Sequence, residues 1–342
     1  MTQYFGVFLG SRLRILAFLC FVGALLPWAD AAHAAARSDL FQATGTLLDR
    51  SDAGYTAAFQ AALKTVLVRV TGLRSADANP ALNPLVNDAR RFVQQFHPAP
   101  DNQLWVAFDG AAIERWLTQN GQPLWGRERP STFVWLAVQT TPVAGIVLTR
   151  DDTSDLKSQL LAQAAVRGIQ LLWPTAADLQ INHLDFAAVN TMPATALAEI
   201  AHRLGGDGVL IGHASNATGM ATVRWTHIFA DRNSDFTGTL EGVDRAADTY
   251  AELFAANGNL APVDIEVVGI GDVKDYANVQ SFLESLSFVT HVSIEALDGD
   301  ACRFRLTTRG GTEPLHRAIA LNGLLLPLAA SDNGLQRFQL RR

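Results

Sequence analysis

Residues 194–213 read Ala-Thr-Ala-Leu-Ala-Glu-Ile-Ala-His-Arg-Leu-Gly-Gly-Asp-Gly-Val-Leu-Ile-Gly-His, and this stretch decides the class of fold. Four of its apolar residues recur at the three- and four-residue spacing of one helix face: Leu197, Ile200, Ala201 and Leu204. Gly205 and Gly206 then supply the left-handed backbone that ends helices. The apolar run at 209–211 is typical of a short strand buried on both faces. The stretch predicts a helix, a turn and a buried strand, with no reacting group among them.

The same alternation of helices and strands continues on both sides of this stretch and predicts an α+β protein of two or three packed units. We expect units at residues 37–140, 141–260 and 261–342. In the first, apolar spacing predicts a long helix at 55–70 and a second helix at 85–96. The last unit has the order strand, helix, strand, strand, helix, which is most of a ferredoxin-like plan, with an edge strand expected at 338–340.

The first 36 residues have the pattern of a secretory signal peptide. Arg12 and Arg14 precede an apolar run at 15–26, and Ala32-His33-Ala34 fits the small-residue cleavage rule, with 34–36 as a close alternative. The apolar run is shorter than the roughly 20 residues that span a bilayer. We therefore expect cleavage, a periplasmic location and no stable membrane span afterwards.

The net charge and the cysteine content limit which partners and which disulfides can be expected. Removing the leader with Arg12, Arg14 and Asp30 leaves 25 basic and 32 acidic residues, a formal net charge of −7. An acidic protein is a poor non-specific partner for nucleic acid, so we expect no nucleic-acid binding. Cys302 is the one cysteine that remains after cleavage, so no internal disulfide is expected.

Three blocks of sequence resemble a known family: residues 62–72, residues 129–136 with Arg129-Pro130 and Trp135-Leu136, and residues 204–212. They look like the bacterial exported family called domain of unknown function 2066, which implies export and no particular activity. The last block also resembles the amino-terminal domain of the Tol–Pal translocation protein and flagellar assembly protein T, which are binding and assembly domains. This second likeness concerns fold alone and implies no site.

Motifs for cofactors and metals are incomplete. Gly269-Ile-Gly271 begins like a dinucleotide-binding turn, but Lys274 stands where the third glycine belongs. Residues 231–235 imitate the start of a calcium loop, but Phe236 replaces its glycine. His202, His213 and His227 could converge but lack a short-spaced pair. We therefore expect no cofactor and no metal.

Motifs for catalysis are no better supported. A Gly-x-Ser-x-Gly elbow is missing from the sequence. Cys302 lies on the apolar side of a predicted strand, where burial disfavours the reactive thiolate. Asp151-Asp152 reads as a solvated turn, although carboxylates distant in sequence could still meet in space. We assign no catalytic residue.

One compact polar cluster lies beside tryptophans. Arg127, Glu128 and Arg129 follow Trp125 closely, and arginine and tryptophan are common anchors of recognition surfaces. Arg127, Arg129 and Trp125 are therefore the candidate interaction surface, although a salt-bridged loop over a core tryptophan would show the same pattern. The sequence favours an exported protein without catalytic activity that binds an envelope protein or a cell-wall component. An envelope hydrolase with a dispersed acid–base site and a carrier for a small ligand remain alternatives.

Overall fold

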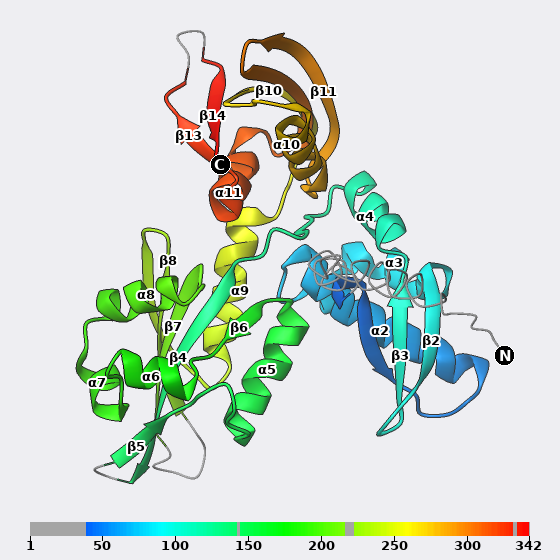
Figure 1. The fold of residues 1–342 in the computed structure, drawn as a ribbon. Coiled ribbons are helices and arrows are strands. Elements are labelled where there is room, and N and C mark those ends of the chain that lie inside the picture. The colour runs from blue at the N-terminus through cyan, green and yellow to red at the C-terminus, as the bar shows by residue number, and fades with distance from the viewer. Residues whose placement is uncertain (1–38, 142–143, 216–221, 331–333, 342) are drawn as a thin grey trace, which may run out of the picture. The chain divides into compact units, whose positions relative to one another are not determined.

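The computed structural model describes residues 39–141, 144–215, 222–330 and 334–341, and it confirms the α+β class (Figure 1). Within these described residues, three sheets, mixed or antiparallel, organise the chain from Leu40 onward. The signal-peptide prediction at 1–36 lies outside the described residues. Each sheet has its own buried core, and the cores change near residues 124–125 and 254–256.

The first sheet is antiparallel with the order β1-β3-β2. Its strands are β1 (Gln42–Thr46), β2 (Val93–Ala99) and β3 (Gln103–Phe108). The predicted long helix is confirmed as α2 (Asp52–Thr71), which packs on one face of this sheet. Ser51 caps its first turn, and Gly72 ends it with a positive φ of 73°. Short helical turns follow: η2 (Ala76–Ala78), η3 (Pro80–Leu82), α3 (Asn83–Asn87) and η4 (Ala89–Phe92).

The helix predicted at 85–96 is wrong. The helical part ends at Phe92, and residues 93–99 form β2, which pairs with β3. The Pro100 carbonyl accepts a hydrogen bond from the Gln103 amide, and Asp101 and Asn102 between them both have positive φ. Aspartate and asparagine tolerate that backbone, which suits the right-handed twist of a hairpin. Pairing with β3 therefore overrides the local helical pattern.

The second sheet has the order β5-β4-β7-β8-β9. Strand β5 pairs with the C-terminal half of β4, and β6 pairs with the first three residues of β4. Its strands are β4 (Ser131–Thr141), β5 (Ala144–Val147), β6 (Gln170–Leu172), β7 (Gly208–Ser215), β8 (Thr222–Phe229) and β9 (Arg232–Thr237). Because β4 pairs in parallel with β7, it belongs to this sheet. The boundary between the first two units therefore falls at 124–130, after α4 (Gly110–Gln119), and not at residue 140.

The stretch 194–213 folds as expected. Residues 194–203 form α8 (Ala194–Arg203), Gly205 has a positive φ of 92°, and β7 follows. Val209, Leu210 and Ile211 are almost fully buried. Leu210 packs with the side that holds α5 (Asp155–Arg167) and α9 (Glu241–Phe254), and its two neighbours pack on the side of α7 (Phe186–Thr191) and α8. Helices on both faces explain the unbroken apolar run, and α6 (Ala176–Ile181) precedes α7.

The hairpin of this sheet is tighter than residues 231–235 suggested. Phe229 pairs directly with Arg232, so Ala230 and Asp231 alone form the turn, and Ala230 has a positive φ of 53°. Most of the supposed loop is strand β9. Asp235 accepts a hydrogen bond at 2.6 Å from Thr226 across the two strands, which uses its carboxylate within the hairpin.

The C-terminal sheet has the order β11-β12-β10-β14-β13. Its elements are β10 (Leu260–Val268), α10 (Val273–Ser285), β11 (Val289–Asp298), β12 (Ala301–Arg309), α11 (Thr312–Asn322), β13 (Leu325–Leu328) and β14 (Gln336–Leu340). The predicted strand, helix, strand, strand, helix order is confirmed. Residues 338–340 do belong to a strand, but β14 lies inside the sheet beside β10, and the edge is the unpredicted β13.

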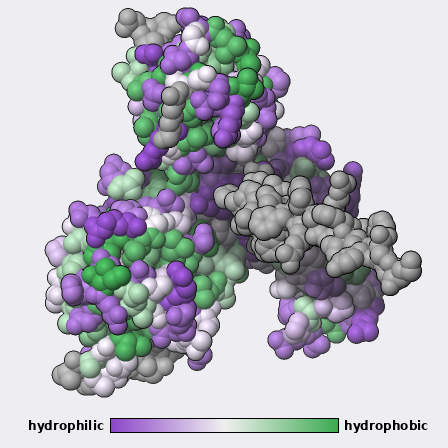
Figure 2. Space-filling view, viewed as in Figure 1, coloured by the Kyte–Doolittle hydropathy of each residue, from purple (hydrophilic) through white to green (hydrophobic). Residues whose placement is uncertain are grey.

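Both edges of the C-terminal sheet carry features that discourage further strand pairing. Pro327 interrupts the short β13, and β11 has register shifts at two places along its length. Ile294 and Leu297 of β11 are 44% and 69% exposed, and Figure 2 shows hydrophobic surface over this strand. The bulges make the backbone of β11 irregular, and an added strand would need a regular edge to pair with.

Candidate functional site

Three arginines meet where helices α2 and α5 end. Arg69, in the last turn of α2, donates from Nε to the Ala165 carbonyl of α5 at 2.9 Å. Arg167, the last residue of α5, donates from Nη2 to the Gly72 carbonyl after α2 at 3.1 Å. The last carbonyls of a helix lack intrahelical donors and carry the negative end of its dipole. The arginine at the end of each helix therefore donates a hydrogen bond to a carbonyl at the end of the other helix.

Arg129 joins both helix ends at once. Its guanidinium donates to the Arg69 carbonyl and the Gly168 carbonyl, both at 2.9 Å, and to two carbonyls of its own turn, Trp125 and Gly126. The guanidinium carbon lies 4.0 Å from the centre of the Trp125 ring. Such a flat, multidentate donor fixes the first unit against the second. This is a structural role inside the protein.

Burial of this positive charge has a measurable electrostatic consequence. Desolvation, followed by the nearby charges of Arg69 and Arg167, lowers the pKa of Arg129 to about 9, whereas Glu128 acts to raise it. Arg129 therefore stays charged at neutral pH and depends on its carbonyl partners.

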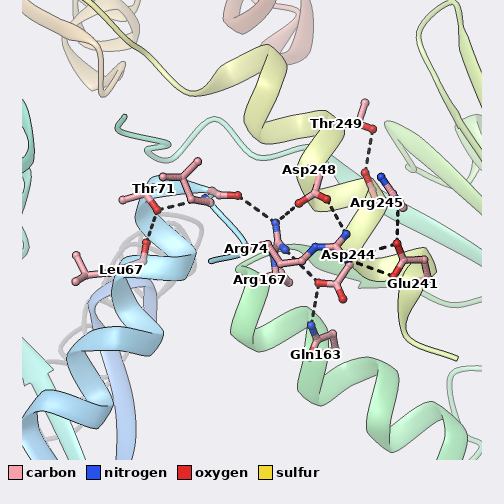
Figure 3. Close-up of polar contacts among 12 residues, drawn as sticks. Leu67, Thr71, Arg74, Gln163, Arg167, Glu241, Asp244, Arg245, Asp248 and Thr249 are labelled. Atoms are coloured by element: carbon pink, nitrogen blue, oxygen red, sulfur yellow. Dashed lines mark hydrogen bonds and ion pairs between the residues drawn. The ribbon is translucent and has the colours of Figure 1, made fainter. Parts of the chain in front are cut away.

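Acidic residues of α9 balance Arg167 (Figure 3). Asp244 accepts from Arg167 at 3.1 Å, and Asp248 accepts from it at 2.6 Å, while the other Asp248 oxygen accepts from Arg74 at 2.7 Å. Only 1% of the Arg167 side chain is exposed. A buried charge with this number of partners would be costly to leave unpaired. The network therefore ties α9 to the ends of α2 and α5.

The turn that carries Arg129 also reaches the last unit. Both carboxylate oxygens of Glu128 accept hydrogen bonds from Ser287, from its amide at 2.8 Å and its hydroxyl at 2.6 Å. Leu124 forms a two-way backbone bridge with Ala256. Residues 124–129 thus contact all three sheet units. We call this segment the central turn.

The structure divides the three residues of the candidate interaction surface. Trp125 is fully buried, and its ring nitrogen donates to the Glu128 carbonyl at 3.2 Å. Arg129 points inward as described, whereas Arg127 is exposed. Arg127 lies near Glu114. The pKa of Glu114 is raised, mainly by burial and also by the charge of Glu128, and the charge of Arg127 opposes this rise. Of the three, Arg127 alone offers a side chain to a partner.

The three histidines that could converge occupy separate places. His202 contacts the Gly206 carbonyl, His213 contacts the Asn190 side chain, and His227 lies buried 3.4 Å from the Tyr250 hydroxyl. Among the described residues, no group of three or more His, Cys, Asp or Glu side chains is placed to hold a metal ion. His227 instead completes a buried polar contact with Tyr250, whose hydroxyl also lies 2.9 Å from that of Thr132.

The burial of His227 predicts a pH-dependent stability. Burial lowers the pKa of His227 from 6.5 to about 4, so between these values the unfolded chain binds a proton that the folded chain refuses. The contribution of the neutral His227 to the free energy of unfolding is complete above pH 6.5. It is lost as the pH falls towards 4, by about 3 kcal/mol in total. We measure the free energy of unfolding by urea denaturation at several pH values. In His227→Gln, the loss of this free energy between pH 6.5 and pH 4 should be smaller than in wild type.

The exposed His291 provides the control for this experiment. His291→Gln makes the same exchange at an exposed position, so it should leave in place the loss of stability below pH 6.5 that His227 causes. Equal slopes in wild type and His227→Gln would contradict the assignment.

The remaining motifs have ordinary structural roles. Gly269-Ile-Gly271 leads from β10 to α10, and Asp272 caps that helix. Asp152 accepts from the amide and hydroxyl of Thr149, which closes a turn. Cys302 is a free and buried thiol, and burial raises its pKa. These residues stabilise local structure.

Two further features bear on the alternatives and on the membrane. A depression of about 410 Å³ on the C-terminal unit is lined partly by charged residues, including Asp264, Glu295 and Arg303. A carrier for an apolar ligand would need an enclosed apolar cavity instead. Within the described residues, no helix combines the length and the apolar character needed to cross a bilayer.

The first sheet carries a feature that the sequence reasoning missed. Helix α2 covers one face, and the other face presents nine side chains: Gln42, Thr44, Thr46, Gln95, His97, Ala99, Gln103, Trp105 and Ala107. We call this the open face. His97 and Trp105 stack with ring centroids 4.6 Å apart, and His97 is exposed. The alternation of β3 was visible in the sequence, but the predicted helix at 85–96 took in the first half of β2 and no strand was predicted at His97, so this histidine could not be paired with Trp105.

Comparison with known protein families gives a different family from the one that the sequence blocks suggested. Residues 34–126 match the model of a domain of unknown function, DUF8605. The resemblance to domain of unknown function 2066 is therefore wrong, as are the likenesses to the Tol–Pal and flagellar assembly domains. Two of the three blocks that suggested them, at 129–136 and 204–212, lie outside the matched residues. Neither a curated protein nor a solved structure matches the chain. The part that is similar to DUF8605 contains the first sheet and its open face.

Proposed function

We infer that this protein is exported and acts by binding in the bacterial cell envelope, with the open face of the first sheet as its contact surface. The observation that carries the proposal is the stacked pair of the exposed His97 and the half-buried Trp105, surrounded by uncharged polar side chains on a sheet face. Tryptophan is a common anchor of recognition surfaces. The leader pattern at 1–36 supports the location.

The arginine junction supports binding rather than catalysis. The half-buried Arg129 and the buried Arg167 hold the first unit against the second, which keeps the open face in a fixed position. A hydrolase would need carboxylates free to exchange protons. Glu114 and Glu128 interact electrostatically, but Ser287 occupies both oxygens of Glu128. That arrangement suits a fixed acceptor better than a general base.

Photocrosslinking in living cells tests the proposal. A photoreactive amino acid in place of Gln95, on the open face, should crosslink an envelope component. The same substitution at the exposed Glu284 of α10 should not. The crosslinked protein should be found in the periplasmic fraction, with a chain that begins at Ala35 or Arg37. A cytoplasmic, uncleaved chain, or equal crosslinking from both positions, would contradict the proposal.

A further inference from the structure

The centre of the open face has an aromatic ring with one covered side. In the register of the sheet, Trp105 lies between His97 on β2 and Thr44 on β1. The His97 ring stacks on the indole at an interplanar angle of 18°. Thr44, the cross-strand neighbour on the other side, is short and exposed, and cannot cover an indole. Trp105 itself is half-buried, and among the described residues His97 is the one ring stacked on it, so we take the side of the indole towards Thr44 as the side that a flat apolar group can reach.

Polar groups flank this ring on both sides along the strands. Gln103 lies opposite Thr46, and its amide donates weakly to the Thr46 hydroxyl at 3.4 Å. Gln95 stands one row away on the other side, opposite Ala107. Amides both donate and accept, and hydroxyls do the same, so the two rows offer groups of either kind to a ligand.

The open face has no formally charged side chain. The nine side chains of the open face include no lysine, arginine, aspartate or glutamate. The His97 Nδ1 lies 3.1 Å from the Pro98 carbonyl, which leaves Nε2 for a ligand. A nucleic acid or an acidic peptide would find no countercharge here, and its desolvation would go uncompensated.

We propose that the open face binds a neutral glycan, with a sugar ring stacked on the free side of Trp105 over Thr44. A pyranose ring has an apolar face of C–H groups and a rim of hydroxyls. The first matches an indole, and the second matches amides and hydroxyls one row away. The inference rests on the function proposed above, because it names the ligand of the same surface.

Titration calorimetry tests this with the protein purified from the envelope fraction. The probes are chitohexaose, cellohexaose and maltohexaose, with a proline decapeptide as the alternative flat and uncharged ligand. We expect wild type to bind at least one of the sugars and not the peptide. Trp105→Ala should weaken that binding roughly tenfold or more. Binding of the peptide alone, or of none of the sugars at millimolar concentration, would overturn the proposal.

Two further variants keep the test informative if Trp105→Ala folds poorly. Thr44→Tyr places a ring against the free side of the indole and suits a strand, so it should abolish sugar binding while the protein stays folded. Phe96→Ala is the matched control, since Phe96 lies on β2 next to His97 but packs against Tyr55 and Phe59 on the opposite face of the sheet. It should leave sugar affinity unchanged. Unaltered binding in Thr44→Tyr would overturn the assignment of the stacking site.

The two proposals fail in different ways. Crosslinking of a protein from position 95, without sugar binding in the calorimeter, would overturn the glycan and leave the envelope-binding function standing. Loss of specific crosslinking at position 95 would overturn the function itself.

Discussion

Replacing Arg129 by methionine should lower the free energy of unfolding by about 4 kcal/mol. Methionine keeps much of the apolar stem but removes the donors to the carbonyls of Arg69, Gly168, Trp125 and Gly126. The first two oxygens lie at helix ends, where no other backbone donor is available. Urea denaturation followed by circular dichroism measures the loss, and limited proteolysis should show a new cut within the central turn.

Arg127→Met is the matched control for this substitution. Arg127 lies two residues away in the same turn but is exposed, so the same exchange should change stability by less than about 0.5 kcal/mol. Arg129→Lys should recover part of the loss, because an ammonium keeps the charge but cannot span the carbonyls of both helix ends. Similar stabilities for the two methionine variants would show that the junction does not depend on Arg129.

A single methyl group at Gly45 should be nearly as damaging. Alanine normally improves on glycine inside a strand by about 0.5–1 kcal/mol. At Gly45, however, a Cβ would stand 2.0 Å from the Ala58 carbonyl oxygen of α2, and the backbone cannot swing aside. Gly45→Ala must therefore push α2 off the first sheet, and we expect a loss of about 3 kcal/mol.

The control for Gly45→Ala is its neighbour on the other face of β1. Thr44→Ala removes an exposed side chain and should cost about 0.5 kcal/mol or less. Both stabilities follow from urea denaturation of the same preparations. A stabilised Gly45→Ala protein would contradict the close packing of α2 on β1.

Sequence reasoning succeeded where the pattern was local and repeated. The apolar spacing of α2 and α8 predicted those elements, because burial on one face imposes a period on the chain. It failed at β2, where glutamines and a short apolar pattern favoured a helix and only pairing with β3 favoured a strand.

The candidate site shows the same division. Clustering of Arg127, Arg129 and Trp125 was evident in the sequence, but whether each side chain points outward or inward was not. The pair of His97 and Trp105 was missed altogether, since the two residues become neighbours only through the register of two strands. A hairpin signal existed in Asp101-Asn102, and recognising it would have placed both rings on one face.

The sequence by itself determined the α+β class, the buried strand after Gly205-Gly206 and the order of elements in the last unit. Those features follow from hydrophobic periodicity and from glycine's backbone freedom, which are properties of neighbouring residues. Only the tertiary structure decided that Arg69, Arg129 and Arg167 bind helix ends rather than a partner. The physical reason is that their acceptors are backbone carbonyls. Every residue has one, so no side-chain pattern can reveal which of them an arginine will find.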